Sequence, residues 1–490
     1  MEKYWGFIVL GLWLSAMLLF GLISTEPYGI EENAARGLLL NWSVADNVIN
    51  PVLVLGVPDF RALLFMPVGT YWPGSILAAK VLTLLIAFAA VSMLYRWSRD
   101  SEGKEPALIA SALLLISPAL LSQIDAMDIG PYLLLGFALG AWMDHAYRRK
   151  PRYFGGWYFG QMIWVAILIT LSPMAIAYPL ALAWHWQRNP DEHKKSRHVF
   201  IGLGISTVVA VLISGGWDNI AWFGNPVEAL ALALQGSVAW SRADIAWAPG
   251  IIATVLLALV IAIEREFFLR DLLGRMLFLA IVFGLVMASE AWALLAITAI
   301  LYRGVPLLIR WNQSWRKQSF LGQRGLVAVL TLVVATAFMW QDKAHALMHK
   351  IEAYTPEDEL IMRLANIAAD QSRPFRVASQ WPGRTMLAAR RDVLPLPRYY
   401  DNLEQLEKNL KGLTHLAFDP YAEENKLLAD GIASLTGVTE TLALMKGGVI
   451  LAVRDHTVEL KHYRPPVNPE SEEKPKTDKA TPSGETENAD

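Results

Sequence analysis

The stretch WYFGQMIWVAILITLSPMAIAYPLALAWHW, from Trp157 to Trp186, decides how this chain folds. It is too long for one membrane span, which needs about 20 apolar residues, and it carries Leu171, Ser172 and Pro173 near its centre. Basic segments flank it on both sides, HAYRRKPR before it and QRNPDEHKKSRH after it. Because basic loops prefer the cytoplasm, both ends belong on the same side of a membrane. The sequence therefore predicts a hairpin of two short spans that turns near Ser172 and Pro173.

The composition of the whole chain indicates a helical membrane protein. The 490 residues are 54% hydrophobic and 18% charged, with a mean hydropathy of +0.33, which is too apolar for an ordinary soluble protein. The apolar runs are long and do not alternate with polar residues, so they favour helices over barrel strands. The net charge of -2 gives no reason to expect a nucleic-acid partner, and the lack of cysteine excludes disulfides and cysteine-ligated zinc.

The loops between the apolar runs agree on one topology. Besides the hairpin, spans are predicted at 5–24, 75–96, 106–123, 129–147, 198–216, 249–264, 274–288, 291–309 and 325–341, about 11 transmembrane helices in all. RWSRDSEGKEP, EREFFLRDLLGR and RWNQSWRKQSFLGQR are basic or mixed and fall inside. The loops at 25–74, 121–130 and 217–248 are poor in Lys and Arg and fall outside. With a cytoplasmic N-terminus, the region after the last span lies outside the cytoplasm.

Three regions follow from this pattern. We expect a transmembrane domain over 1–345, an extracytoplasmic α/β domain over 355–461 and a disordered tail over 465–490. PFRVASQW, THLAFDPY and GGVILAVRD favour strands, whereas DNLEQLEKNLKGL and AEENKLLADGIASL favour helices, with Asp401 as the N-cap of the first. The predicted fold is thus a polytopic α-helical membrane protein with a small C-terminal α/β domain.

Carboxylates gather in the first two outer loops. Glu31 and Glu32 are adjacent in the first loop, where 34–42 and 60–68 have the pattern of short helices along the membrane surface. The second loop, SQIDAMDIGPY, carries Asp125 and Asp128. If the spans around it pack beside the first loop, four carboxylates meet at one membrane face, an arrangement that suits general-base chemistry. Two structural alternatives remain open: a merely solvated first loop, and Asp128 as the N-cap of the following span.

The order of these features resembles the GT-C superfamily of membrane glycosyltransferases. In that family an Asp-Glu pair follows the first span, and here Glu31-Glu32 stands in GIEENAARGLL. A second family motif is similar to AMDIGP at 126–131, followed by the apolar run LLLGFALGAW. The most similar branch contains the protein O-mannosyltransferases and the lipid A aminoarabinose transferase, and the likeness covers mainly residues 1–190. The hairpin with its central proline and the extracytoplasmic domain also resemble that branch.

The resemblance implies a function and a set of roles. It implies an enzyme of the cytoplasmic (inner) membrane that moves a sugar from a polyprenyl-phosphate-linked donor to a lipid, glycan or protein acceptor at the outer face. Glu31 would be the base that activates the acceptor hydroxyl, with Glu32 and Asp128 placing the acceptor or a divalent metal. No metal requirement follows from the sequence itself.

Cations and aromatic rings of the outer loops are the candidate substrate-binding groups. Cationic side chains stabilise a leaving phosphate, and aromatic faces suit sugars, although tryptophan is also common at membrane interfaces. The selected residues are Arg36, Arg61, Asp125, Trp217 and Arg242. Lys80, near the outer end of the second span, is expected to snorkel toward water rather than to meet a lipid phosphate.

Departures from the family pattern keep a second hypothesis open. Glu31 replaces the family's Asp, Asp125 lies where a basic residue commonly precedes the second motif, and 171–173 lacks the lysine often found at the hairpin tip. Basic groups at such places would bind the donor phosphate. The alternative is therefore a catalytically degenerate relative that acts as a scaffold or assembly factor in envelope glycan biosynthesis. A transporter is disfavoured, because the charged residues cluster at one face and no span looks broken around a midplane site.

Overall fold

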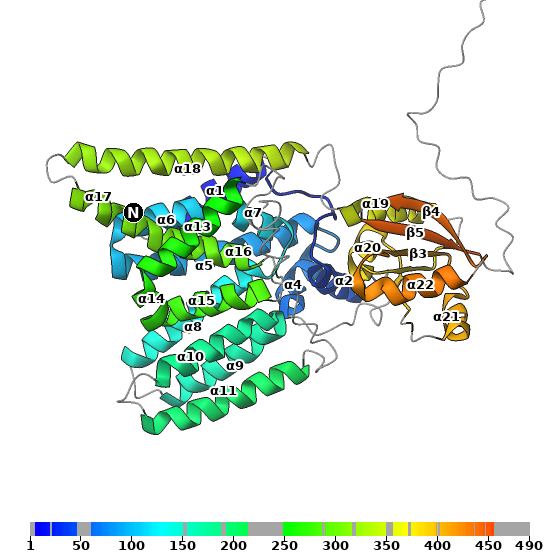
Figure 1. Ribbon diagram of the computed structural model, residues 1–490, viewed down its shortest axis with the longest axis horizontal. Coiled ribbons are helices and arrows are strands. Elements are labelled where there is room, and N and C mark those ends of the chain that lie inside the picture. Colours follow the sequence, from blue (N-terminus) through cyan, green and yellow to red (C-terminus); the bar gives the residue numbers. More distant parts are fainter. Residues whose placement is uncertain are drawn as a thin grey trace, which may run out of the picture.

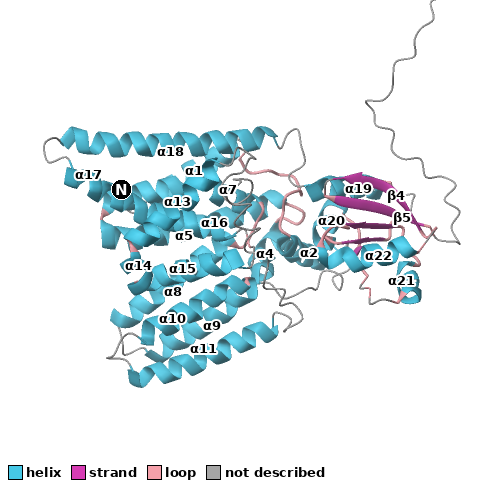
Figure 2. Ribbon diagram, in the orientation of Figure 1, coloured by secondary structure: helices cyan, strands magenta, loops and turns pink. Residues whose placement is uncertain are grey.

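The computed structural model places most of the chain. The ranges it describes are 5–19, 22–46, 60–149, 154–187, 193–213, 248–286, 289, 291–315, 320–348, 356–370, 374–397, 399, 402–435, 437–445 and 447–454. The tail predicted over 465–490 lies outside these ranges. The described chain forms a helical bundle and, beyond it, a small unit that contains the only strands of the described residues (Figures 1 and 2).

The bundle comprises the helices up to residue 348. They are α1 (Trp5–Leu19), α2 (Glu32–Asp46), α4 (Phe60–Tyr71), α5 (Ile76–Glu102), α6 (Lys104–Leu115), α7 (Pro118–Asp125), α8 (Gly130–Arg149), α9 (Phe154–Leu171), η3 (Pro173–Ile176), α10 (Ala177–Gln187), α11 (His193–Ile213), α13 (Ala248–Ile263), α14 (Arg265–Arg270), α15 (Leu272–Val286), α16 (Ala291–Ala299), η6 (Ile300–Gly304), α17 (Val305–Trp315) and α18 (Phe320–Met348). The two short surface helices predicted after the first span are confirmed as α2 and α4.

The lengths of the apolar helices do not confirm the predicted number of spans. Within the described residues, three helical stretches are long and apolar enough to cross a membrane: Ile76–Glu102, Ala291–Asn312 and Gly325–Lys343. A fourth results if the pair Lys104–Leu115 and Pro118–Asp125, bent by 46° at Ser117, counts as one span. Shorter apolar helices, among them α15 and parts of α9, α11 and α13, belong to the same bundle (Figure 1). The chain thus has the apolar helices of a membrane protein.

The hairpin predicted from Trp157 to Trp186 is present. α9 ends at Leu171, and Ser172 caps the next turn, because its hydroxyl accepts a hydrogen bond from the N–H of Met174 at 3.2 Å. Pro173 occupies the first position of that turn, where its missing N–H is harmless. The chain then reverses, so that both α9 and α10 pack against α11 (Figure 1).

The C-terminal unit is an α/β sandwich built on one mixed sheet. Its strands are β1 (Val377–Ser379), β2 (Val393–Pro395), β3 (His415–Phe418), β4 (Thr439–Met445) and β5 (Gly448–Val453), in the order β2-β1-β3-β5-β4. β1 is parallel to both β2 and β3, whereas β5 is antiparallel to both β3 and β4. Its helical elements are α19 (Pro356–Ala369), α20 (Pro382–Ala389), α21 (Leu403–Leu410), η7 (Glu423–Asn425) and α22 (Lys426–Ser434).

The alternation of side chains along the strands separates two apolar layers. Val377, Ala417 and Ile450 share one buried cluster with residues of α19 and α20. Residues one position away, such as Ala378 and Leu416, share another cluster with residues of α21 and α22. This is the period of two expected for a sheet covered on both faces.

Several local predictions for this unit need correction. The predicted strands at β1, β3 and β5 are present, but β2, β4, α19 and α20 were not predicted. The cap of α21 is Asn402 rather than Asp401, since the Asn402 side chain accepts a hydrogen bond from the N–H of Gln405 at 3.1 Å. Asp401 itself lies outside the described residues.

The layer of α19 and α20 joins the C-terminal unit to the bundle. The buried cluster that contains Leu360 of α19 and Met386 of α20 also contains Ile30, Leu38 and Leu39 from the start of the first outer loop and α2. α2 packs on α4 on one side and on α20 on the other, and Figure 1 shows α2 and α4 between the other helices of the bundle and the sheet. The acidic stretch of the first loop therefore lies at the junction of the two units, with Glu31 and Glu32 partly exposed.

Candidate active site at the start of α2

Glu31 is the residue immediately before α2 and caps it. Its carbonyl accepts the first helical hydrogen bond, from the N–H of Ala35 at 2.9 Å, and its side-chain Oε2 accepts one from the N–H of Ala34, also at 2.9 Å. Glutamate is an unusual cap, but here its longer side chain still reaches the third residue of the helix. The backbone N–H of Glu31 donates to the carbonyl of Ala126 at 2.8 Å, which ties the first outer loop to the second.

Arg61 of α4 lies beneath this cap. Its side chain is fully buried, and its Nη2 lies 2.8 Å from Oε2 of Glu31. Its Nη1 donates to the carbonyl of Met127 at 3.1 Å. One guanidinium thus connects the acidic residue of the first loop with the backbone of the second, and a buried cation of this kind requires carboxylate partners.

The second outer loop presents Asp128 through a strained backbone. Met127 has φ +54°, a left-handed conformation that costs an ordinary side chain about 1–2 kcal/mol. Asp128 is half-buried, and its Oδ1 accepts a hydrogen bond from the N–H of Ile129 at 2.6 Å. The first residue of α8, Gly130, donates its N–H to Oε1 of Gln123 at 3.2 Å. The helix therefore does not depend on Asp128 as its cap, contrary to the structural alternative for this residue.

The electrostatic coupling between these groups shows in Asp128. Burial raises the pKa of the Asp128 carboxyl above its usual range, and the Glu31 carboxylate raises it further. The N–H of Ile129 and the guanidinium of Arg61 act in the opposite direction. Glu31 and Asp128 therefore belong to one site around Arg61, as the sequence suggested.

Glu32 belongs to a different set of contacts. Its Oε1 accepts hydrogen bonds from the N–H of Gly383 at 2.7 Å and from Nε of Arg36 at 2.8 Å, and its Oε2 accepts one from the N–H of Arg384 at 3.0 Å. Burial raises the pKa of Glu32, although Arg36 and these two backbone N–H groups oppose the shift. The two adjacent glutamates thus diverge, one toward Arg61 and the other toward α20.

Asp125 and Lys80 form a buried ion pair below the site. Lys80 Nζ lies 2.9 Å from Oδ1 of Asp125, and both side chains are almost completely buried. The same oxygen accepts a hydrogen bond from the N–H of Ser24 at 2.9 Å. The expectation that Lys80 snorkels toward water is wrong, because a carboxylate of α7 holds it inside. The interactions of Asp125 tie α5, α7 and the start of the first outer loop together.

The remaining candidates divide into engaged and undescribed residues. Arg36 is partly exposed and paired with Glu32. Trp217 and Arg242 lie outside the described residues. The candidate phosphate-binding cations that the structure does describe, Arg36 and Arg61, are therefore each bound to a glutamate.

A metal would need a larger set of ligands than this site offers. Among the described residues, no group of three or more His, Asp or Glu side chains has the geometry to hold a metal ion. Arg61 takes the place that a cation would occupy beside Glu31. Within the described residues, this site therefore offers no ligand set for the divalent metal that the resemblance allowed.

Two residues of the C-terminal unit at this junction were not predicted. Asp358 of α19 is buried, and its Oδ2 accepts a hydrogen bond from the N–H of Gly29 at 3.0 Å. Its Oδ1 lies 2.6 Å from Nη2 of Arg384. The strand-turn-helix sequence VASQWPGR, in which a proline opens a helix, was a local signal for α20, but no local signal indicates that α20 meets the first loop.

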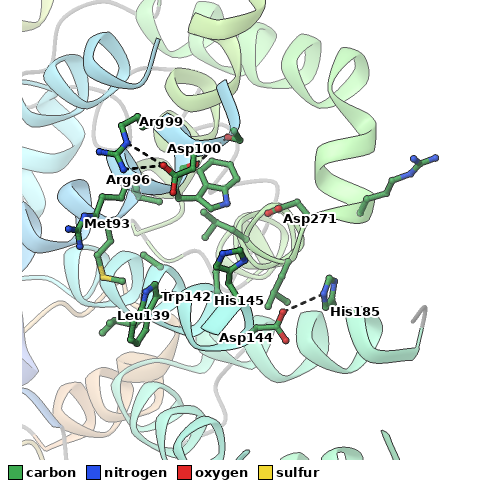
Figure 3. Close-up of a pocket in the computed structure, with 18 residues that line it drawn as sticks. Met93, Arg96, Arg99, Asp100, Leu139, Trp142, Asp144, His145, His185 and Asp271 are labelled. Carbon is green, nitrogen blue, oxygen red and sulfur yellow. Dashed lines mark hydrogen bonds and ion pairs between the residues drawn. The ribbon is translucent and has the colours of Figure 1, made fainter. Parts of the chain in front are cut away.

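A cavity of about 820 Å³ lies elsewhere in the bundle (Figure 3). It is lined by the final turns of α5 and α8, by His185 of α10 and by Asp271 before α15, and two of its acidic residues, Asp100 and Asp144, lie near Arg99 and His185. Asp128 precedes the first turn of α8, whereas the cavity residue Asp144 lies near the other end of that helix, roughly 24 Å farther along at about 1.5 Å per residue. The cavity is therefore separate from the carboxylate site.

Comparisons with known proteins identify the class of fold. No protein-family model matches the chain, and no curated protein matches it by sequence. Solved structures do match: the helical bundle and the C-terminal unit together share the fold of ArnT, a member of the branch that the sequence resembles. The resemblance inferred from the sequence is confirmed at the level of the fold.

The chain is similar to ArnT from Cupriavidus metallidurans. Against its apo structure the TM-score is 0.54 at 12% sequence identity, and the match covers 91% of this chain and 98% of that one. Against ArnT bound to undecaprenyl phosphate the TM-score is 0.56 at 13% identity, with the same coverage of both chains. At such low identity the likeness defines the fold and leaves the substrates to other arguments.

Proposed function

We propose that this protein is a glycosyltransferase of the cytoplasmic membrane that transfers a sugar from a polyprenyl-phosphate-linked donor to an acceptor at the outer face. The donor class is suggested by ArnT, which shares the fold and binds undecaprenyl phosphate. The acceptor is a lipid, glycan or protein with a hydroxyl or amino group. The N-terminus would be cytoplasmic and the C-terminal unit extracytoplasmic, as the basic loops predict.

The observation that carries the proposal is the group formed by Glu31, Arg61 and Asp128. Carboxylates from two outer loops, distant in the sequence, are brought to one buried guanidinium. A strained backbone at Met127 presents one of them, and strain of this kind is concentrated at functional sites. A purely solvated loop would need neither a fully buried arginine nor a left-handed methionine.

In the proposed reaction Glu31 is the general base. Its Oε2 is held by Arg61 and the N–H of Ala34, whereas its Oε1 has no hydrogen-bond partner within the described part of the chain. About a quarter of the side chain is exposed, and in the proposed reaction Oε1 accepts a hydrogen bond from the hydroxyl of the acceptor. That oxygen takes the proton as the acceptor oxygen attacks the anomeric carbon, and the bond from that carbon to the donor phosphate breaks.

The other residues support this step. The phosphate leaves with the bonding electron pair, so an in-line attack inverts the anomeric configuration. Arg61 holds Oε2 of Glu31 in place. Burial and the Glu31 carboxylate raise the pKa of Asp128, and Asp128 in its protonated form is a hydrogen-bond donor to the acceptor. Glu32 does not take part in this scheme, because the N–H groups of α20 and Arg36 engage both its oxygens.

One observation favours the alternative, a degenerate relative that acts as a scaffold or assembly factor. Arg36, Arg61 and Lys80, three of the cations near the site, are each paired with a carboxylate of this chain. A phosphate bound in this region would have to compete with those carboxylates or use cations outside the described residues.

The experiment that separates the two functions is a comparison of Glu31→Ala and Asp128→Ala in cells of the source organism. The enzyme hypothesis predicts that both variants, expressed at wild-type levels, lose the surface glycan that depends on this protein. The control is Glu440→Ala, which removes an exposed carboxylate paired with Arg454 and should leave the glycan intact. Unchanged glycans in both site variants, with the loss of a co-purifying partner instead, would favour the scaffold.

A further inference from the structure

The carboxylate of Glu32 sits at the N-terminus of α20. α20 follows β1, and β1 lies between β2 and β3 with all three strands parallel, so this helix starts at the carboxyl edge of the parallel strands. Such an edge, with the free N–H groups of a helix N-terminus, is where α/β folds commonly bind an anionic ligand. In this protein the anion is supplied from α2 of the same chain, through the N–H groups of Gly383 and Arg384.

The contact leaves little room for a side chain at position 383. A Cβ atom on Gly383 would lie 2.8 Å from Oε1 of Glu32, 3.0 Å from the backbone oxygen of Glu32 and 2.7 Å from Cγ of Arg36. The carboxylate of Glu32 and the side chain of Arg36 would then have to shift, and the contact with the backbone of α2 would be tight. The close approach of α2 thus favours glycine at this position, independently of the hydrogen bonds.

A second contact holds the chain just before Glu31. Asp358 of α19 binds the N–H of Gly29 through one oxygen and Arg384 through the other. Arg384 therefore contributes to both contacts, with its backbone N–H to Glu32 and its side chain to Asp358. The C-terminal unit is hydrogen-bonded to the first outer loop at Gly29 and at Glu32, and Glu31 lies between these two positions.

We propose that Glu32 is a positioning residue whose capture by α20 sets the start of α2 and thereby the placement of Glu31 against Arg61 and Asp128. The C-terminal unit is then part of the frame of the active site and not merely an appended domain. The contribution to sugar transfer rests on the proposed function, whereas the attachment of α20 to α2 through Glu32 does not depend on it.

The first test measures the attachment without any enzyme assay. Hydrogen exchange of the full-length protein in detergent is followed by mass spectrometry in peptides that cover 380–389 and 29–35. Because Glu32→Gln replaces two charge-assisted hydrogen bonds by weaker contacts, we expect exchange in both peptides to accelerate about tenfold. Gly383→Ala should have the same effect, because the added Cβ displaces the carboxylate.

The matched controls change the same residue types at positions away from the contact between α2 and α20. Gly325→Ala in α18 adds a Cβ that meets no atom within 4 Å, and Glu440→Gln removes the charge of an exposed carboxylate. Neither should alter exchange in the two peptides. If Glu32→Gln and Gly383→Ala also leave it unchanged, the attachment does not stabilise α2 and the proposal is overturned.

The second test measures transfer by the same variants with a polyprenyl-phosphate sugar donor. A misplaced base lowers kcat by about 10- to 100-fold, while the KM for the donor changes less than about twofold, since no donor contact is removed. Loss of transfer in Glu32→Gln with wild-type exchange would make Glu32 a participant in the reaction and overturn its positioning role. Faster exchange with undiminished transfer would also overturn it.

The proposed function and this inference fail in different ways. If the wild-type protein transfers no sugar, the proposed function fails, and the attachment is then judged by exchange alone. In that case faster exchange in both peptides of Glu32→Gln and Gly383→Ala supports the positioning of Glu31 by the C-terminal unit, and unchanged exchange at 29–35 contradicts it.

Discussion

Replacement of Arg61 by methionine is the most demanding test of the carboxylate site. Arg61 is fully buried and bridges Glu31 Oε2 at 2.8 Å and the carbonyl of Met127 at 3.1 Å. Methionine fills a similar volume without charge, so the variant leaves Glu31 and Asp128 close together with no cation. Removal of one partner from a buried ion pair typically lowers stability by about 3–5 kcal/mol.

The structure also predicts how this loss is relieved. In Arg61→Met/Glu31→Gln the uncompensated carboxylate is gone, so the double variant should be more stable than Arg61→Met alone by about 1–3 kcal/mol. The Glu31→Gln variant alone should lose less stability than Arg61→Met, because Arg61 still faces the carboxyl group of Asp128. These stabilities are compared by thermal unfolding midpoints measured in one detergent. The control is Arg270→Met, which removes an exposed arginine that lies 3.5 Å from the carboxylate of Glu266.

Two outcomes would refute this reasoning. If Arg61→Met unfolds at the wild-type temperature, the guanidinium does not hold the two loops together. If the losses of the two single variants simply add in the double variant, Glu31 and Arg61 are not energetically coupled, and the site described around them is not a unit.

Three further predictions concern buried charges elsewhere. Lys80→Met should lower the thermal midpoint strongly, because it leaves the buried carboxylate of Asp125 without its cation. The addition of Asp125→Leu should restore much of the lost stability. Equal midpoints in the single and double variants would contradict the pairing. The folded state raises the pKa of Asp128, so this residue holds its proton to higher pH than in the unfolded chain. The stability of the wild type relative to Asp128→Asn should therefore fall as pH rises from about 4 toward neutrality. A difference in thermal midpoint that stays constant over this pH range would count against the shift. Burial lowers the pKa of His415 to about 4 from 6.5. The stability of the wild type should therefore fall as pH drops from 6.5 to about 4, by roughly 3 kcal/mol at most. Thermal midpoints of His415→Gln, measured across the same pH range, should not show this acid sensitivity.

The parts of the fold that follow from local sequence were predictable. The hairpin depends on Ser172 and Pro173 between basic flanks, and α2 and α4 depend on apolar segments within a loop. The meeting of Glu31 with Asp128 also followed, because it needs only that neighbouring spans pack and that both loops face the same side. Signals of this kind are contained within a few turns of the chain.

The parts that were missed depend on partners far apart in the sequence. Lys80 and Asp125 are separated by 45 positions, and Glu32 and Gly383 by 351, so nothing near either residue indicates the contact. Glu32 carries the same side chain as Glu31 and follows it directly. Only the docking of α20 decides that one glutamate meets a guanidinium and the other a helix N-terminus.

The central claim is that Glu31 is the base of a polyprenyl-phosphate-dependent sugar transfer, and one measurement addresses it directly. Purified wild-type protein, Glu31→Gln and Glu440→Gln are incubated in proteoliposomes with a sugar-labelled polyprenyl-phosphate donor and a membrane extract as the source of acceptor, and the release of free polyprenyl phosphate is measured. We predict release by the wild type and by Glu440→Gln, and a rate at least about 100-fold lower for Glu31→Gln, because a general base contributes roughly that factor or more. Equal release by Glu31→Gln and the wild type would contradict the account.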